Sequence, residues 1–218
     1  SKPNMAQVPA SYSPYGKECR GLWTIPHGYW LVGCDASGLE LRMLAHYMND
    51  KRYTNEILTG DIHTANQLSA GLETRDQAKT FIYAFLYGAG DEKIGSILGG
   101  GASIGKKVKK KFLDNTPALK SLRERVATAS LNTLLQGAGA IIMKKALVLL
   151  NNYAILKGID YKFIGNIHDE IQTEVSEADA KIFGEIAVKA IQEAGKELNL
   201  NCPLDGEYKI GETWNETH

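Results

Sequence analysis

The sequence predicts an α+β fold in which strand-forming segments at both ends of the chain flank a long helical middle. Residues 29–34 form a short apolar run that indicates a buried strand, and residues 161–175 contain two such runs that indicate a hairpin. Between them, apolar residues recur at helical spacing, most clearly over residues 76–87. This order of elements predicts an antiparallel sheet packed with helices and a helical insertion.

Composition bounds the class of protein. The 218 residues are 44% hydrophobic and 23% charged, which is ordinary for a globular protein of one large or two small domains. Lys and Arg number 25, as do Asp and Glu, so any surface for nucleic acid must come from local segregation of charge. Three widely spaced cysteines argue against a disulfide framework and a zinc site. We find no signal-peptide pattern and no apolar run of membrane-spanning length, and we expect a cytoplasmic protein that contacts no membrane.

The first half of the chain alternates turn-rich and apolar segments. Residues 1–28 are rich in Pro and Gly and indicate an irregular lead-in to the strand at 29–34. A helix is expected from Leu39, residues 50–61 are polar and mixed, and a short helix is expected near 62–69. The apolar face expected on the first helix consists of Leu41, Leu44, Ala45 and Met48.

The second half contains the clearest periodicity. The helix at 76–87 is followed by glycines at its expected C-terminal cap, and its apolar face consists of Ala78, Phe81, Ile82, Phe85 and Leu86. Helices are also expected over 117–129 and 131–150, and a capping box at Ser176 and Asp179 opens another. The expected core of the hairpin is Phe163, Ile164, Ile167, Ile171 and Val175. The last helix is expected to bury Phe183, Ile186, Ala187, Ala190, Ile191, Ala194 and Leu198.

Acidic residues follow two of the predicted strands. Asp35 ends the first apolar run, and Asp169 and Glu170 lie at the hairpin turn. A strand-terminal Asp is often only a turn former or a helix cap, and for Asp35 alone that interpretation would be favoured. A second acid in the same kind of position instead favours oxygen ligands for a pair of divalent ions that act on a phosphate.

A polar stripe lies beside the apolar face of the helix at 76–87. Arg75, Lys79, Tyr83 and Tyr87 recur every four residues, which places them on one side of a helix. Two cations followed by two aromatic rings suit a nucleoside triphosphate. The alternative is a solvated face with two tyrosines at the boundary of the core.

Four further features of the sequence each allow two interpretations, one functional and one structural. His63, in the first turn of a short helix, is a phosphate donor or a structural histidine, and His168 either packs in the hairpin or positions its backbone. The lysines between 106 and 111 form a solvated face or contact a phosphate backbone. Gln136 precedes two helical glycines, which allow close helix packing or leave room for a nucleic-acid strand.

Three ordered motifs resemble those of family A (Pol I-like) DNA polymerases. Residues 35–42 (DASGLELR) resemble motif A, residues 75–90 (RDQAKTFIYAFLYGAG) resemble motif B, and residues 168–170 (HDE) resemble motif C. Residues 3–9 (PNMAQVP) resemble the segment that precedes motif A. Within the family, the sequence GDIHT at 60–64 and Tyr83 are most similar to the replicative polymerases of short-tailed phages.

The resemblance implies a fold and a reaction. Residues 1–50 and 131–218 would form the palm, and residues 51–130 the inserted fingers, with the motif B helix at about 76–87. The reaction would be template-directed DNA synthesis by two-metal phosphoryl transfer. Asp35 and Asp169 would bind two Mg²⁺ ions, with Glu170 beside them as a further catalytic acid.

The resemblance also implies substrate contacts. Arg75, Lys79 and His63 would hold the triphosphate, while Tyr83 and Glu40 would bracket the deoxyribose. Exclusion of a 2′-hydroxyl by Glu40 favours DNA over RNA synthesis, which argues against a single-subunit RNA polymerase.

Contacts to DNA are implied for four residues. Tyr87 would stack near the templating base, Arg20 and Gln136 would contact primer–template, and His168 would support the primer end. The partners implied are primer–template DNA, deoxynucleoside triphosphates, and a processivity factor or the polymerase domains that this sequence lacks.

The sequence departs from the family in two ways. Nothing in it matches the thumb or the 3′–5′ exonuclease, and several dozen family residues are missing between Arg125 and Asn132. We expect a palm-and-fingers fragment with weak grip on DNA. The non-enzymatic alternative is an impaired fragment that binds nucleotide or DNA or complements a missing partner. If the chain is encoded by a phage, its location would be the host cytoplasm.

Overall fold

A computed structural model describes residues 5–126 and 128–218, without the side chains of residues 6 and 128–130. The chain forms two compact units, one of residues 1–39 and 139–218 (unit 1) and one of residues 40–138 (unit 2). The predicted lead-in motif therefore begins outside the described residues, and the expected deletion after Arg125 lies partly outside them.

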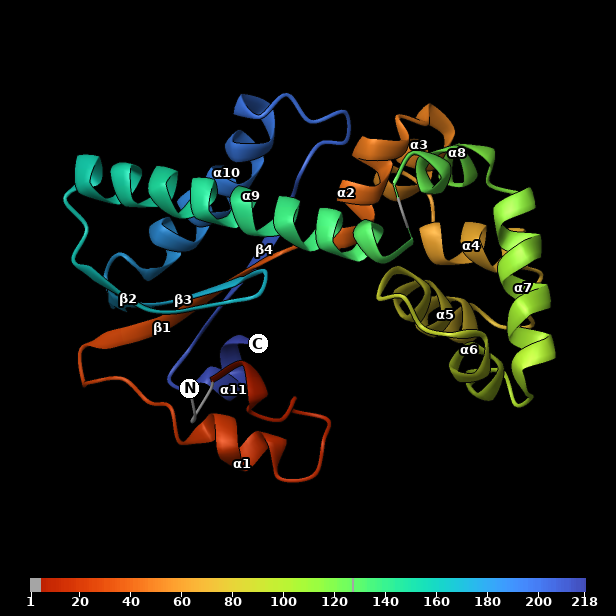
Figure 1. The fold of residues 1–218 in the computed structure, drawn as a ribbon. Coiled ribbons are helices and arrows are strands. Elements are labelled where there is room, and N and C mark those ends of the chain that lie inside the picture. The colour runs from red at the N-terminus through yellow and green to blue at the C-terminus, as the bar shows by residue number, and fades with distance from the viewer. Residues whose placement is uncertain (1–4, 127) are drawn as a thin grey trace. The chain divides into compact units, whose positions relative to one another are not determined.

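Unit 1 is built on a four-stranded antiparallel sheet with the strand order β2-β3-β1-β4. In Figure 1, α9 and α10 lie on one face of this sheet, and α1 and α11 lie on the other. Its elements are η1 (Met5–Gln7), α1 (Gly16–Gly21), β1 (Tyr29–Ala36), β2 (Tyr161–Ile167), β3 (Glu170–Ser176), α10 (Ala180–Glu197), β4 (Gly206–Gly211) and α11 (Trp214–Thr217).

The central position of β1 explains its burial. Residues 31–34 are buried, and their side chains alternate between the two faces. On one face, a Cβ at Gly33 would collide with the Gln172 amide and the Thr217 carbonyl group, so α11 lies directly over the strand. On the other face, a Cβ at Gly184 of α10 would collide with the Tyr208 ring of β4. The absence of side chains at both glycines permits this close layering.

The hairpin is confirmed, but part of its expected core is wrong. Ile171 and Val175 on β3 are buried, whereas Phe163 and Ile164 on β2 are 36% and 44% exposed. The reason is that β2 is an edge strand, and its register shifts between Phe163 and Gly165. A strand with only one neighbour buries fewer of its side chains.

The start of α10 also differs from the prediction. The Ser176 hydroxyl donates to the Asp179 carboxylate at 2.7 Å, so these two side chains bond to each other instead of capping backbone amides. Asp179 is the N-cap residue, and no side-chain cap bond forms there. The predicted apolar face of α10 is buried apart from Leu198, which lies just after the helix and is 38% exposed.

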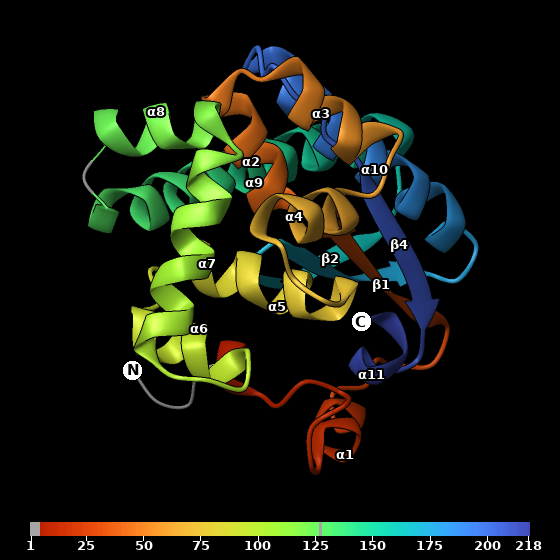
Figure 2. The ribbon, with the colours of Figure 1, turned by 90° about the vertical axis from the view of Figure 1, so that its right-hand side faces the viewer.

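Unit 2 is helical and has its own core. Figure 2 shows α5 among α4, α6 and α7. The predicted apolar face of α5 is buried, and Phe81 and Phe85 meet Phe112 of α7 edge to face, with ring centroids 5.2 and 5.5 Å apart. The elements are α2 (Leu39–Met48), α3 (Lys51–Leu58), α4 (Ile62–Ala70), α5 (Arg75–Leu86), α6 (Asp91–Ile97), α7 (Ala102–Asp114) and α8 (Pro117–Arg125).

One segment of unit 2 differs from the prediction, and the sequence left the environment of another open. The mixed polar segment at 50–61 contains α3, which begins after Asp50 because the Asp50 carboxylate accepts from the amides of Arg52 and Tyr53. The lysine run at 106–111 lies on α7, whose inward residues Gly105 and Phe112 are buried. Both helices have few apolar residues, so their periodicity is weak in the sequence.

α9 (Thr128–Lys157) extends seven residues beyond the expected helix and passes through both units. Its segment Leu131–Lys157 is long and apolar enough to cross a membrane by length and composition alone, contrary to the expectation from the sequence. Within unit 1, however, Met143 and Leu150 are buried in the core, and Lys145 pairs with Glu197 of α10 at 2.5 Å. These contacts are those of a core helix.

Candidate active site

The two aspartates predicted to bind metal meet at one end of the sheet in unit 1. Asp35 is the penultimate residue of β1, and Asp169 lies in the two-residue turn between β2 and β3. The Ala36 amide donates to the Asp169 carbonyl at 3.0 Å, so the turn is bonded directly to the strand that carries Asp35. Residues 134 positions apart in sequence are thereby held by neighbouring backbone.

Two further acidic residues lie in a row with Asp35 across the sheet. In the strand register Asp35 lies opposite Glu170 of β3 and Glu207 of β4, so the three residues project from the same face of the sheet. Like charges placed opposite one another repel, and a bound cation removes that cost. No local pattern singled out Glu207, which lies in the polar segment 202–218 where at most short strands were expected, and only strand pairing brings it beside Asp35.

Glu170 is buried, and its side chain has three hydrogen-bonding partners. Its side chain accepts from Trp214 Nε1 at 2.8 Å, contacts His218 Nδ1 at 2.7 Å and accepts from the Gln172 amide. Only 4% of the residue is exposed, whereas Asp35 is exposed and Asp169 half-buried. The acid expected to assist catalysis is therefore bonded to α11 and β3.

The donor set suits magnesium assembled with substrate. Mg²⁺ in nucleotide enzymes is usually held by one or two carboxylates, with water and phosphate oxygens completing the octahedron. Asp35 and Asp169 provide such carboxylates at the end of the sheet where β1 ends and β3 begins. Among residues 5–126 and 128–218, no three His, Cys, Asp or Glu side chains are arranged to hold a metal by themselves. The residues present fit a site that needs the substrate's oxygens.

His168 has an unusual backbone for its residue type. Its φ of 56° is left-handed, which costs a side-chain-bearing residue about 1–2 kcal/mol. The two-residue turn imposes this angle, and the residue is exposed. His168 therefore lies next to Asp169 without being a packing residue of the hairpin.

In unit 2, the polar stripe of α5 is confirmed as a helical face. The helix begins with a capping box between Thr74 and Gln77, which places Arg75 in its first turn. Arg75 and Lys79 are exposed, and Tyr83 is half-buried. The Tyr83 ring lies beside the ring of His63 on α4, with centroids 6.3 Å apart. Folding thus brings His63 to the stripe.

The amides at the start of α4 are already occupied. The Asp61 carboxylate accepts from the amides of His63 and Thr64 at 3.0 and 3.4 Å, so these donors are not open to a phosphate. Asp61 also accepts from Arg75 Nε at 2.6 Å. The Arg75 guanidinium holds the pKa of Asp61 well below its usual range.

The ring of His63 remains suited to a ligand. Its Nδ1 is buried and has no hydrogen-bond partner among the described residues. Burial, with the charge of Arg75, lowers the pKa of His63, so the imidazole is neutral near pH 7. A neutral imidazole beside two cations can donate to a phosphate or take up a proton when a phosphate arrives.

Glu40 and Tyr87 form a second pair in unit 2. The Tyr87 hydroxyl donates to the Glu40 carboxylate at 2.9 Å, and Tyr87 is 48% exposed. Glu40 was expected to act with Tyr83, and its hydrogen bond with Tyr87 was not predicted from the sequence. It depends on the packing of α2 near the end of α5, which no local pattern encodes.

The residues expected to contact DNA are dispersed. Arg20 is buried, with Nε donating to the Pro9 carbonyl at 2.9 Å and the guanidinium 4.5 Å from the centre of the Trp214 ring. Gln136 is exposed on α9, and a Cβ at Gly137 would meet open space. Gly139 instead approaches Leu39 closely, so close packing explains the glycine at 139 but not the glycine at 137. On α7, Lys109 pairs with Asp91 at 2.9 Å, while Lys106, Lys107 and Lys110 are exposed.

Comparisons with known proteins agree on one family. The family model described as DNA polymerase family A matches residues 1–129 and 118–216. A DNA-directed DNA polymerase of Enterobacteria phage T3 is 42% identical over 270 residues, which cover 99% of this chain and 38% of the relative. The corresponding enzyme of Escherichia phage T7 is 41% identical over 270 residues with the same coverage.

A solved structure shares the fold. It is described as the POL domain of Pol1 from M. smegmatis in complex with DNA primer-template and dNTP, and it matches with a TM-score of 0.84. The match covers 99% of this chain and 45% of that one, at 20% sequence identity. The chain thus spans well under half the length of the phage relatives and somewhat under half of this structure.

Proposed function

The chain belongs to DNA polymerase family A, and from that premise we propose that it catalyses template-directed addition of deoxynucleoside 5′-triphosphates to a primer 3′ end. In this reaction the primer 3′ oxygen loses its proton and bonds to the α-phosphorus, and the bond to the leaving pyrophosphate breaks. The observation that carries the proposal is the bond between the Ala36 amide and the Asp169 carbonyl, which joins the two acid-bearing segments.

Asp35 and Asp169 would hold the two Mg²⁺ ions. When bound, the ions would activate the primer hydroxyl and neutralise charge on the leaving pyrophosphate. The protein's contribution is a fixed pair of carboxylates on hydrogen-bonded backbone, so little reorganisation is needed when substrate binds.

Three residues of unit 2 would hold the triphosphate. Lys79 is exposed on α5 and can approach phosphate oxygens directly. To bind phosphate, Arg75 must break its ion pair with Asp61. Because both side chains are 41–50% exposed, this ion pair is weak enough for a phosphate to replace the carboxylate. His63 would donate through its ring and gain a proton as the negative charge arrives, so nucleotide affinity should rise as pH falls from 8 to 6. His63→Gln should flatten that dependence.

Sugar selection and DNA contacts complete the proposal. Tyr83 and Glu40 would bracket the deoxyribose and reject a 2′-hydroxyl, and Tyr87 would stack near the templating base once released from Glu40. Arg20, Gln136 and His168 would contact primer–template. The phage alignments extend over 270 residues, more than the 218 of this chain, which supports the expected internal deletion. Further polymerase domains or a processivity factor would then supply grip on DNA, in the cytoplasm of the host if the chain is encoded by a phage.

Single-nucleotide primer extension tests the proposal. With Mg²⁺, a labelled primer–template and one correct nucleotide, the chain should add one residue, while Asp35→Asn and Asp169→Asn should each lower the rate by at least about 10³-fold, equivalent to about 4 kcal/mol. Asp160→Asn is the matched control, because Asp160 accepts from the Tyr29 hydroxyl in the same unit. Unchanged rates in both active-site variants would contradict the metal assignment.

The same assay separates the alternatives. Preference for ribonucleotides would favour an RNA polymerase over the role given to Glu40. No extension by the parent chain, together with measurable nucleotide or DNA binding, would favour an impaired fragment. No feature of the residues that the structure describes favours either alternative.

A further inference from the structure

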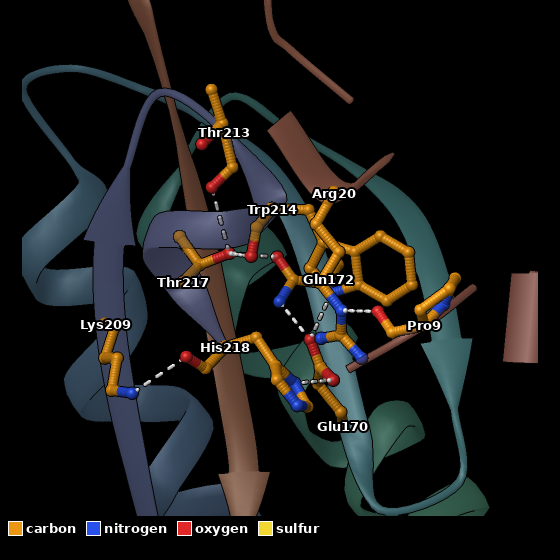
Figure 3. A network of polar contacts seen from close by, with 9 residues as sticks. All are labelled: Pro9, Arg20, Glu170, Gln172, Lys209, Thr213, Trp214, Thr217 and His218. Carbon is orange, nitrogen blue, oxygen red and sulfur yellow. Dashed lines mark hydrogen bonds and ion pairs between the residues drawn. The ribbon is translucent and has the colours of Figure 1, made fainter. Parts of the chain in front are cut away.

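The buried carboxylate of Glu170 lies at the centre of a polar network that connects β3 to α11 (Figure 3). Trp214 Nε1 donates to it at 2.8 Å, His218 Nδ1 lies 2.7 Å away, and the Gln172 amide donates from the same strand. Because a carboxylate only accepts, His218 Nδ1 must carry the proton in this contact. Three donors thus satisfy a carboxylate that has almost no access to water.

The network continues on both sides of Glu170. The Thr217 hydroxyl donates to the Gln172 side-chain oxygen at 2.9 Å, and Lys209 donates to the His218 carbonyl at 3.0 Å. Trp214 is 3% exposed, with the guanidinium of Arg20 4.5 Å from its ring centre. α11 is therefore attached to the sheet at several points, and Trp214 of α11 and His218, which directly follows it, share Glu170 as a partner.

Glu170 directly follows the turn that carries Asp169. Glu170 is the first residue of β3, so hydrogen bonds that hold its side chain also restrict the position of the preceding turn. This follows because each residue has only two soft backbone dihedral angles. Removal of one of the three donors leaves the buried carboxylate less well compensated, and a shift of the strand end toward water would recover the lost hydrogen bond. Such a shift would strain the bond between the Ala36 amide and the Asp169 carbonyl.

We infer that Trp214 and His218 are positioning residues that hold Asp169 beside Asp35 through the Glu170 carboxylate, and that Glu170 serves this anchor instead of a metal ion. The inference rests on the proposed function only for its catalytic consequence. Its structural consequence, a firmly held turn, is independent of the reaction.

Hydrogen exchange at the Ala36 amide reports the position of the turn without any catalysis. Trp214→Phe keeps an aromatic ring but removes the donor, and exchange at Ala36 should accelerate at least about tenfold. Trp23→Phe is the matched control, because Trp23 meets Trp214 edge to face at 6.2 Å and is bonded to it only through backbone. This control should leave the exchange rate unchanged.

A second pair of variants tests His218. His218→Ala removes the donor, whereas His218→Asn keeps an amide donor near the position of Nδ1. Exchange at Ala36 should accelerate in the alanine variant and return toward the parent rate in the asparagine variant. In a Glu170→Ala background, Trp214→Phe should have no additional effect on exchange, because the shared acceptor is gone.

Kinetics supply the functional readout. Loss of a group that orients a metal ligand typically lowers activity 10–100-fold, so kcat for single-nucleotide extension should fall by about that factor in Trp214→Phe, with KM for the nucleotide nearly constant. Unchanged exchange at Ala36 in both Trp214→Phe and His218→Ala would overturn the inference, even if kcat fell. If the parent chain extends no primer, the proposed function fails, while the exchange experiment still decides the inference.

Discussion

Gly33 and Gly137 provide a matched test of how the structure uses glycine. A Cβ at Gly33 would collide with the Gln172 amide and the Thr217 carbonyl group and would lie 2.9 Å from Thr217 Cβ. At Gly137, in the middle of α9, the same Cβ would meet nothing within 4 Å. The two Gly→Ala variants remove similar freedom from the unfolded chain, so they differ chiefly in the folded state.

The expected magnitudes have opposite signs. Overpacking at Gly33 costs about 1–3 kcal/mol, offset by about 0.4–1 kcal/mol from the stiffer unfolded chain, so the free energy of unfolding should fall by about 1–2 kcal/mol. Gly137→Ala should raise it by about 0.5–1 kcal/mol, because alanine is the better helix former. With an m-value of about 2 kcal/mol per molar urea, the midpoints should move down by roughly 0.5–1 M and up by roughly 0.25–0.5 M.

Urea unfolding followed by circular dichroism measures both shifts, and an unchanged m-value confirms that each is a change in stability. Gly33→Ala should also slow primer extension more than Gly137→Ala does, because Gln172 bonds to Glu170 next to the Asp169 turn. A Gly33→Ala midpoint equal to or above that of the parent would refute the close layering of α11 on β1.

Three further predictions address the core, an ion pair and a thiol. Phe112→Ala should lower the free energy of unfolding by about 3–5 kcal/mol in urea titrations, because its fully buried ring meets Phe81 and Phe85; a loss below about 1 kcal/mol would contradict this packing. The Arg75 guanidinium lowers the pKa of Asp61 from its ordinary value of 3.8, so the ion pair stabilises the fold above pH 3.8 and this stabilisation is lost as pH falls below that value. The Tm of Asp61→Asn should therefore fall less steeply with acid than the Tm of the parent. Parallel Tm–pH curves for the two proteins would refute the role of the ion pair. Burial raises the pKa of Cys34 to about 12, so mass spectrometry after iodoacetamide treatment at pH 8 should find Cys34 unmodified and the half-buried Cys19 alkylated, and rapid labelling of Cys34 would oppose the structure.

Local patterns in the sequence were sufficient for the elements that fold around their own apolar periodicity. The apolar faces of α2 and α5 and the hairpin with its turn at His168 and Asp169 were predicted from spacing alone. α3 and the exposure of Phe163 were not, because a polar helix and an edge strand acquire their environment from neighbours distant in sequence.

The same division applies to the candidate site. The sequence by itself determined the family-like motifs, the acids Asp35 and Asp169 and the stripe from Arg75 to Tyr87, since each depends on residues that are close in the chain. Only the tertiary structure decided that Glu170 is buried under α11, that Asp61 caps α4 while it pairs with Arg75, and that Glu207 joins the row of Asp35. These arrangements arise from strand register and helix packing over long separations, and the energies that fix them are sums over partners that no short sequence window contains.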